Sequence, residues 1–174
     1  MTRNAWLGTV LLLAAGIVLL QAVDRSDAGN LAGPARVIDG DTLAIGGQRV
    51  RIIGVDAPET RQICRNAARQ GWPCGVEAAE AMRAHLGQDP VSCRLAGRDR
   101  YGRDLGECAL EGHDLGSWLV RQGWAIPFGD RRKVYEAQRR AAQASRRGLW
   151  AGPFDRPADW RRTHARHRED RLAP

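Results

Sequence analysis

The sequence predicts an α+β fold in which five short β-strands form a small barrel and about three α-helices pack against it. The first observation is length, since 174 residues allow one domain with a real core plus appendages. The second is order, because three strand-like segments come first, and helical segments are interposed and follow. The third is a polar turn flanked by two further apolar runs. No repeat of fixed period is visible, so one compact domain is expected.

The first strands are expected at residues 35–38, 42–45 and 48–55. Gly46 and Gly47 separate the last two segments, which is typical of a tight hairpin turn. Two more strands are expected in VSCRLAG and LGECAL, on either side of the turn RDRYGRD.

Three helices are expected between and after these strands. Residues 75–86 place Val76, Ala79, Met82 and Leu86 near one face. Asp114 can cap a helix that runs to Trp124. The last helix, residues 133–147, would end at Gly148 as a glycine C-cap. Five short strands with such helices in about 125 residues suit an OB-type barrel, a fold that commonly binds oligonucleotides or oligosaccharides.

The N-terminal segment indicates export or anchoring. Residues 5–23 carry no charge and are rich in Leu, Val and Ala. Their length suits a membrane span, and the following Ser-Asp-Ala at 26–28 suits signal cleavage, so both outcomes stay open. The expected division is residues 1–28 as signal peptide or membrane anchor, 29–155 as the folded domain and 156–174 as a basic, flexible tail.

The four cysteines agree with an exported, periplasmic or extracellular protein. They are separated by 9, 18 and 14 residues, which lacks the paired spacing of a structural zinc site. Cys93 and Cys108 are equidistant from the centre of the RDRYGRD turn and would face each other in a hairpin, where a disulfide can form. Cys64 and Cys74 would then close a small loop. Four free thiols in a cytosolic protein are the alternative.

The charge balance is compatible with a polyanionic partner. The formal net charge is +7, and residues 156–174 supply six arginines against three acids. Lys133 is the only lysine among the 27 basic residues, so an arginine-biased, solvated surface explains the same charge. Charge alone therefore does not indicate nucleic acid.

An acidic cluster predicts a metal site. Asp39 and Asp41 are two residues apart in extended chain, so their carboxylates tend to leave on one face. Asp56 and Glu59 follow the third strand, and Pro58 favours an extended Ala57 whose carbonyl can point outward. Carboxylates with a carbonyl are hard oxygen ligands for Ca²⁺ or Mg²⁺. The alternative is two ordinary turns with exposed acids.

Two arginines favour the interpretation of the acidic cluster as a functional site over its interpretation as two ordinary turns. Arg51 stands among apolar residues in VRIIGV, so its guanidinium must reach a rim or a partner. Arg103 follows the Tyr101-Gly102 turn, which can aim it at the same place. A metal, a carboxylate base and two arginines are what hydrolysis of a phosphodiester requires.

Four motifs together resemble the staphylococcal nuclease-like (thermonuclease) family. RVIDGDT, VRIIGVDAPET, DRYGR and LVRQGWA stand in the family's order and approximate spacing across residues 34–150. The resemblance implies an OB barrel with three helices and a Ca²⁺-dependent nuclease that cleaves DNA and RNA, breaking the 5′ P–O bond. It implies calcium ligands at Asp41, Asp56 and the Ala57 carbonyl, with Asp39 near the metal. It further implies Glu59 as general base, Arg51 and Arg103 as phosphate-binding residues, and substrate contacts at Arg100 and Tyr101.

The chain departs from the family's prototype after LVRQG. The prototype has nucleotide-holding tyrosines there, whereas this chain has Trp124 and Phe128 and no tyrosine until Tyr135. The leading expectation is a monomeric, exported or membrane-tethered nuclease. The alternatives are a non-catalytic OB module that binds nucleic acid or an anionic polysaccharide, and a subunit of an envelope assembly. A binding-only protein would be expected to lose Glu59 or an arginine, and this chain retains them.

Overall fold

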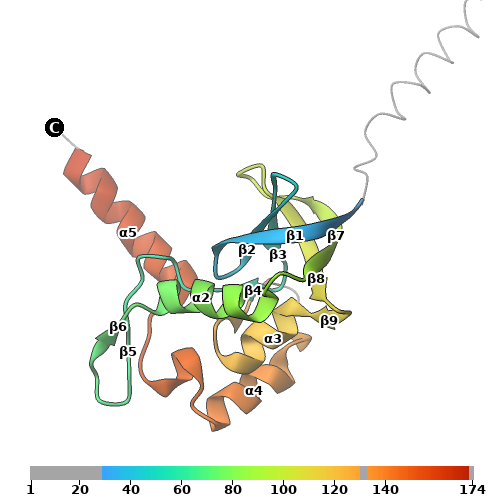
Figure 1. Cartoon of the computed structure of the whole chain (residues 1–174). Coiled ribbons are helices and arrows are strands. Elements are labelled where there is room, and N and C mark those ends of the chain that lie inside the picture. The colour runs from blue at the N-terminus through green and yellow to red at the C-terminus, as the bar shows by residue number, and fades with distance from the viewer. Residues whose placement is uncertain (1–28, 130–132, 173–174) are drawn as a thin grey trace, which may run out of the picture.

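Five strands form a closed barrel in the computed structural model, which describes residues 29–129 and 133–172 (Figure 1). The hydrogen-bonded order is β3-β2-β1-β7-β8, and β3 also pairs in parallel with β8, which closes the barrel. A short β9 extends the β8 edge. This confirms the predicted α+β, five-stranded OB barrel. The strands are β1 (Asn30–Asp39), β2 (Thr42–Ile45), β3 (Gln48–Ile52), β7 (Pro90–Arg98), β8 (Asp104–Leu110) and β9 (His113–Asp114).

The expected strand 48–55 is divided in two. β3 ends at Ile52, and β4 (Val55–Asp56) begins after Gly54, whose φ of 82° breaks the extended chain. β4 pairs instead with β10 (Ile126–Pro127). The break turns Asp56 away from the barrel ladder and into the loop that carries Glu59.

Four helices lie outside the barrel strands in the described chain. α3 begins where predicted, since the Asp114 side chain accepts a hydrogen bond from the Ser117 backbone N–H at 3.0 Å. It ends at Gln122, two residues before the expected Trp124, with Gly123 as its C-cap. The expected C-cap at Gly148 is wrong, because α4 ends at Ala144 and Gly148 starts a short 3₁₀ helix. The elements are α2 (Cys74–Leu86), α3 (Leu115–Gln122), α4 (Glu136–Ala144), η2 (Gly148–Ala151), α5 (Pro157–Leu172) and the small hairpin β5 (Cys64–Arg65) with β6 (Gly71–Trp72).

The segment expected to be a flexible tail forms the helix α5, which corrects that expectation. Pro157 stands at the start of α5, where a fixed φ favours a helix, and Asp159 lies in the first turn. Asp159 also pairs with Arg162 one turn on, and the Trp160 and His164 rings stack at i, i+4. Figure 1 shows α5 leaving the body of the molecule.

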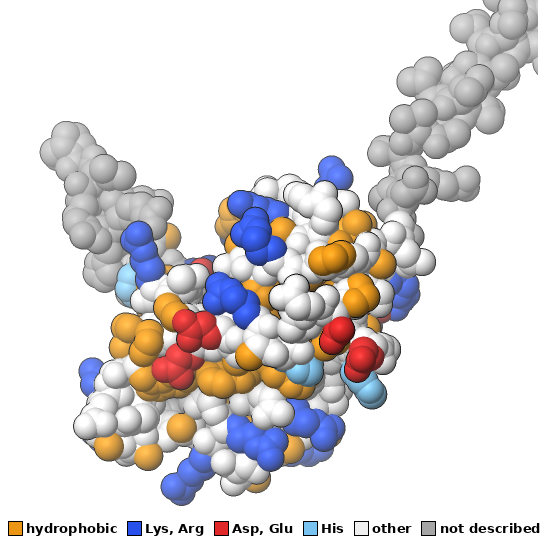
Figure 2. Space-filling view, viewed as in Figure 1, with side chains coloured by type: hydrophobic (Ala, Val, Ile, Leu, Met, Phe, Trp, Pro, Cys, Tyr) orange, Lys and Arg blue, Asp and Glu red, His pale blue; other side chains and the backbone are white. Residues whose placement is uncertain are grey.

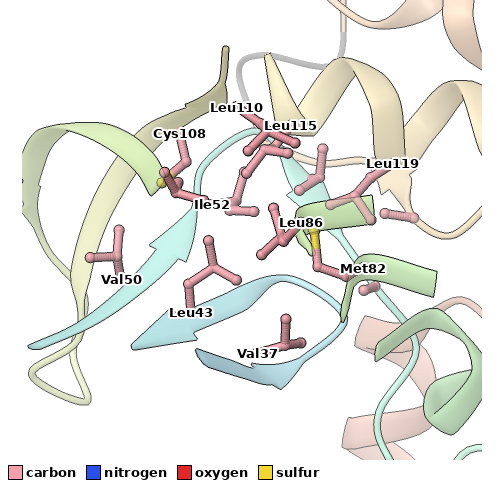
Figure 3. Close-up of a cluster of buried hydrophobic side chains, with 14 of the residues drawn as sticks. Val37, Leu43, Val50, Ile52, Met82, Leu86, Cys108, Leu110, Leu115 and Leu119 are labelled. Carbon is pink, nitrogen blue, oxygen red and sulfur yellow. The ribbon is translucent and has the colours of Figure 1, made fainter. Parts of the chain in front are cut away.

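A continuous apolar core joins the barrel to α2 and α3 (Figure 3). Leu43 and Ile52 from the barrel meet Met82 and Leu86 of α2 and Leu119 of α3, and all five are at most 2% exposed. Burying one such side chain stabilises a fold by roughly 1.5–3 kcal/mol. This core fixes the strand ends and the α2 start that surround the acidic cluster.

Both expected disulfides are present. Cys93 and Cys108 face each other in the β7–β8 ladder, as the symmetric hairpin predicted. Cys64 and Cys74 join the β5 hairpin to the start of α2. The expected signal peptide or anchor, residues 1–28, lies outside the described residues. Among the helices described, none has the length and apolar character needed to cross a membrane.

Candidate active site

Apart from Asp56, the sequence-predicted metal, catalytic and substrate residues line one cleft with a volume of about 730 Å³. Asp56 is fully buried and pairs with Arg51 of the cleft. The walls of the cleft come from the end of β1, from β3, from the loop after β4 and from the turn between β7 and β8. Segments far apart in the sequence therefore converge there. The cleft is lined by Asp39, Asp41, Arg49, Arg51, Ala57, Pro58, Glu59, Asp99, Arg100, Tyr101, Arg103, Phe128 and Arg161.

Arg51 joins two buried carboxylates at the base of the site. Its Nη1 lies 2.5 Å from Asp41 Oδ1, and its Nη2 lies 2.9 Å from Asp56 Oδ1. Asp41 is 3% exposed and Asp56 is fully buried. The expectation that Arg51 needs a partner is met by both acids. The Arg51 side chain is 15% exposed, and the exposed part lines the cleft.

Hydrogen bonds fix both the carboxylate and the backbone of Asp41. Its Oδ2 accepts the Ala57 backbone N–H at 2.9 Å, and its own backbone N–H donates to Asp39 Oδ1 at 3.1 Å. Burial raises the pKa of the Asp41 carboxyl to about 7, with Arg51 opposing the rise and Asp39 adding to it. A cation placed beside this buried carboxyl would stabilise its ionised form and so lower its pKa.

Glu59 is positioned through its main chain. A Cβ on Gly75 would lie 1.8 Å from the Glu59 carbonyl oxygen, so only glycine lets the first turn of α2 pack this closely. The buried Gln62 side chain accepts the Glu59 backbone N–H at 3.3 Å. The Glu59 side chain is 37% exposed and lines the cleft.

Arg103 is presented by a turn that Asp99 organises. The Asp99 carboxylate accepts the backbone N–H groups of Tyr101 and Arg103 and the Arg103 Nε, at 2.8, 3.0 and 2.8 Å. Burial alone would raise the pKa of Asp99, but these hydrogen bonds with Arg103 and Tyr101 outweigh it, so the pKa is lowered. The turn thus places Arg103 on the same cleft as Arg51, as expected.

Two exposed aromatic rings flank the cleft. Tyr101 is 68% exposed, and Arg100 lies over its ring with the guanidinium carbon 4.9 Å from the centroid. Phe128 is 44% exposed and also lines the cleft. Trp124 does not reach the cleft, because it packs on the core and its ring lies 6.3 Å from that of Trp72. Of the two aromatic residues noted after LVRQG, Phe128 alone lines this cleft.

Arg161 enters the site from α5, which the sequence did not predict. Its Nη1 lies 3.0 Å from Asp56 Oδ1 and 2.7 Å from Glu59 Oε1, and its Nη2 lies 3.2 Å from Asp56 Oδ2. Burial alone would lower its pKa, but the hydrogen bonds to these two carboxylates raise the pKa of Arg161 above the ordinary arginine value. The only sequence signal was a basic run, which usually marks a solvated surface.

The carboxylate oxygens of the site are ligands of the kind that a hard divalent cation prefers. Within residues 29–129 and 133–172, no group of three or more His, Cys, Asp or Glu side chains is placed to hold a metal ion. Asp41 and Asp56 are nevertheless close enough for one guanidinium to span them, and the Ala57 backbone N–H donates to Asp41. Two carboxylates offer oxygen ligands only, and water can complete such a shell.

An OB barrel with acids and arginines on one cleft defines a class of phosphodiester-cleaving proteins. The chain matches the family model described as staphylococcal nuclease homologue over residues 49–152. It therefore belongs to the staphylococcal nuclease family. The match includes Arg51, Asp56, Glu59 and Arg103, whereas Asp41 precedes it.

Named relatives point in more than one direction. The chain is 38% identical to the succinoglycan biosynthesis protein ExoI of Rhizobium meliloti (strain 1021), over 85% of this chain and 81% of the relative. It is 31% identical to the probable endonuclease LCL3 of Pyricularia oryzae, over 83% of this chain and 62% of the relative. It is 29% identical to the probable staphylococcal-like nuclease CAN2 of rice, over 71% of this chain, and spans 32% of that protein. At the level of the family, the family model and the two relatives named as nucleases indicate a nuclease hydrolase.

Proposed function

We propose that this chain is a Ca²⁺-dependent nuclease that hydrolyses phosphodiester bonds of DNA and RNA. The observation that carries the proposal is the convergence of Asp41, Arg51, Glu59 and Arg103 on one cleft, with the buried Asp56 paired to Arg51. The carboxylates would hold the cation, and the arginines would bind the phosphate. The exposed rings of Tyr101 and Phe128 offer faces on which bases can stack.

The chemistry assigned to the protein side chains is in-line displacement at phosphorus. Glu59 takes a proton from the attacking water, whose oxygen forms the new P–O bond. Arg51 and Arg103 stabilise the charge that develops on the phosphoryl oxygens. The bond from phosphorus to the 5′ oxygen breaks, and that oxygen takes up a proton as it leaves. Calcium held by Asp41, Asp56 and the Ala57 carbonyl would neutralise phosphate charge and orient water.

A second candidate is an OB module that binds an anionic polysaccharide in the cell envelope without catalysis. The name of the Rhizobium relative, a succinoglycan biosynthesis protein, favours it. Exposed arginines would serve such binding, and Figure 2 shows Lys and Arg side chains gathered at the edge where α4 lies. A binding protein has no use for a carboxylate base beside two arginines, so the nuclease is the stronger candidate.

Incubation of the purified chain with single-stranded DNA and with RNA separates the two candidates. Cleavage with Ca²⁺, its loss in excess chelator and its return on adding Ca²⁺ are expected. Asp41→Ala should move the Ca²⁺ midpoint to much higher concentration. Full activity in excess chelator contradicts the cation site, and anionic polysaccharide binding with no cleavage under any of these conditions supports the second candidate.

We further propose export of this protein, with residues 1–28 as signal peptide or membrane anchor. The two disulfides support an oxidising compartment. Cell fractionation followed by N-terminal sequencing of the mature protein tests both points, since a full-length cytosolic protein would contradict them.

A further inference from the structure

Arg161 occupies the carboxylates that the proposed nuclease needs free. Both oxygens of Asp56 accept hydrogen bonds from Arg161, and Oδ1 also accepts one from Arg51. The Arg161 Nη1 also contacts Glu59 Oε1 at 2.7 Å. One guanidinium therefore blocks a cation ligand and the general base together.

The placement of Arg161 is built into the fold. The buried Gln62 side chain donates to the Asp155 carbonyl at 2.7 Å while it accepts the Glu59 N–H, so one residue joins the root of α5 to the Glu59 loop. Just before that root, the Arg65 N–H donates to the Pro153 carbonyl at 3.1 Å. These contacts fix where α5 starts, and one turn of helix from Pro157 then brings Arg161 to the carboxylates.

A divalent cation competes with Arg161 for Asp56 Oδ2, the oxygen that Arg51 does not contact. Both are positive, and their repulsion is strong in a site where Asp56 is fully buried. The Arg161 side chain is 37% exposed, so water can receive it when it leaves. Arg161 differs from Arg103 in its partners, because Arg161 pairs with the site carboxylates Asp56 and Glu59, whereas Arg103 pairs with Asp99 of its own turn.

We propose that Arg161 is an autoinhibitory latch, in which α5 holds the site closed until a divalent cation displaces the guanidinium from Asp56 and Glu59. This inference rests on the proposed function. The latch lies outside the part of the chain that matches the family model, since that match ends at residue 152. Because cation and latch exclude each other, the apparent cation affinity is the affinity of the open form multiplied by the fraction of molecules that are open.

The test compares Ca²⁺ binding to the full chain and to Arg161→Gln by isothermal titration calorimetry. Arg162→Gln is the matched control, because it removes the same charge from the adjacent, exposed position of α5. Arg161→Gln should bind Ca²⁺ about tenfold more tightly, which corresponds to a latch closed in about nine-tenths of molecules. It should also cleave DNA faster at low Ca²⁺, and Arg162→Gln should behave as the original chain. Should Arg161→Gln fail to fold, Arg161→Lys replaces it, with the same direction of change expected because one ammonium cannot bridge the three contacts.

Hydrogen exchange gives a readout independent of activity. Ca²⁺ should increase exchange of the α5 backbone amides in the original chain, because by linkage a cation that opens the latch loosens its helix. Unchanged or weaker Ca²⁺ binding by Arg161→Gln overturns the latch. Loss of cleavage by this variant at saturating Ca²⁺ also overturns it and makes Arg161 a phosphate-binding residue. If the original chain and Arg161→Gln both bind no Ca²⁺ and cleave nothing, the proposed function itself fails.

Discussion

At the scale of single residues, the site depends on Glu59, whose side chain is 37% exposed, lines the cleft and makes no ion pair with Arg51. Glu59→Gln keeps the shape of the side chain and removes its ability to take a proton. Turnover should fall by about 10² or more while the thermal midpoint stays within a few degrees. Initial rates on single-stranded DNA at saturating Ca²⁺ measure this. Glu80→Gln, an exposed change on α2, is the control and should leave the rate unchanged.

Replacing Arg51 or Arg103 should lower turnover about as much as replacing Glu59, but for a different reason. Arg51→Ala and Arg103→Ala each remove a positive charge that stabilises the phosphoryl oxygens, so turnover should fall by about 10² or more. Arg51→Ala also leaves the buried Asp41 and Asp56 without a shared partner, and it should cost stability as well. Kinetics and thermal unfolding on both variants, beside the exposed Arg83→Ala, separate the two effects. Near-original cleavage by both variants would remove these arginines from the site.

Asp99 controls Arg103 through its charge. The pKa of this carboxyl is lowered in the fold, so its contribution to stability is present above the unfolded value of 3.8 and is lost as pH falls through the lowered folded value. Asp99→Asn should reduce cleavage about tenfold at neutral pH by loosening Arg103. The difference in free energy of unfolding between the original chain and this variant should shrink below pH 3.8. Denaturant unfolding at several pH values checks the sign, and a difference that grows on acidification would contradict it.

At the scale of elements, α2 places the catalytic loop by packing its first turn on the Glu59 main chain. Gly75→Ala puts a methyl group where the Glu59 carbonyl oxygen lies, so the loop or the helix must move. Stability should fall by about 1–3 kcal/mol, and cleavage should fall at least about tenfold because a small displacement misplaces the base. Ala84→Ser adds one atom on the exposed face of the same helix and should change neither. Equal activity of Gly75→Ala and the original chain would show that Glu59 tolerates the shift.

The elements also show what sequence patterns can and cannot predict. The strand-like segment 42–45 and the Gly46-Gly47 pair predicted β2 and its turn, because both signals are local. The division of the next strand depends on Gly54 and on pairing of β4 with β10, a contact distant in sequence. The acids and Arg51 were found because charges in an apolar strand are costly unless they are paired. Arg161 carried no such signal, since it lies in an arginine-rich helix and its partners are about a hundred residues away.

At the scale of the whole molecule, the two disulfides have different relations to the site. Cys93–Cys108 lies within the β7–β8 ladder, and the turn that carries Arg103 is closed separately by Asp99. Cys64–Cys74 ties the chain just after Glu59 to the α2 start, where Gly75 follows. The barrel has its own core, so the protein should stay folded when either bridge is removed.

The double variants Cys64→Ser with Cys74→Ser, and Cys93→Ser with Cys108→Ser, test this difference. The bridges close short loops, with 9 and 14 residues between the cysteines, so each removal should cost roughly 2–3 kcal/mol of stability. Cleavage should fall clearly in the first variant, because the Glu59 loop and α2 lose their tie, and much less in the second. Urea unfolding and initial rates measure the two quantities, while peptide mapping of non-reduced protein checks the pairs. A larger loss of activity in the second variant would show that the Arg103 turn depends on the barrel bridge more than on Asp99.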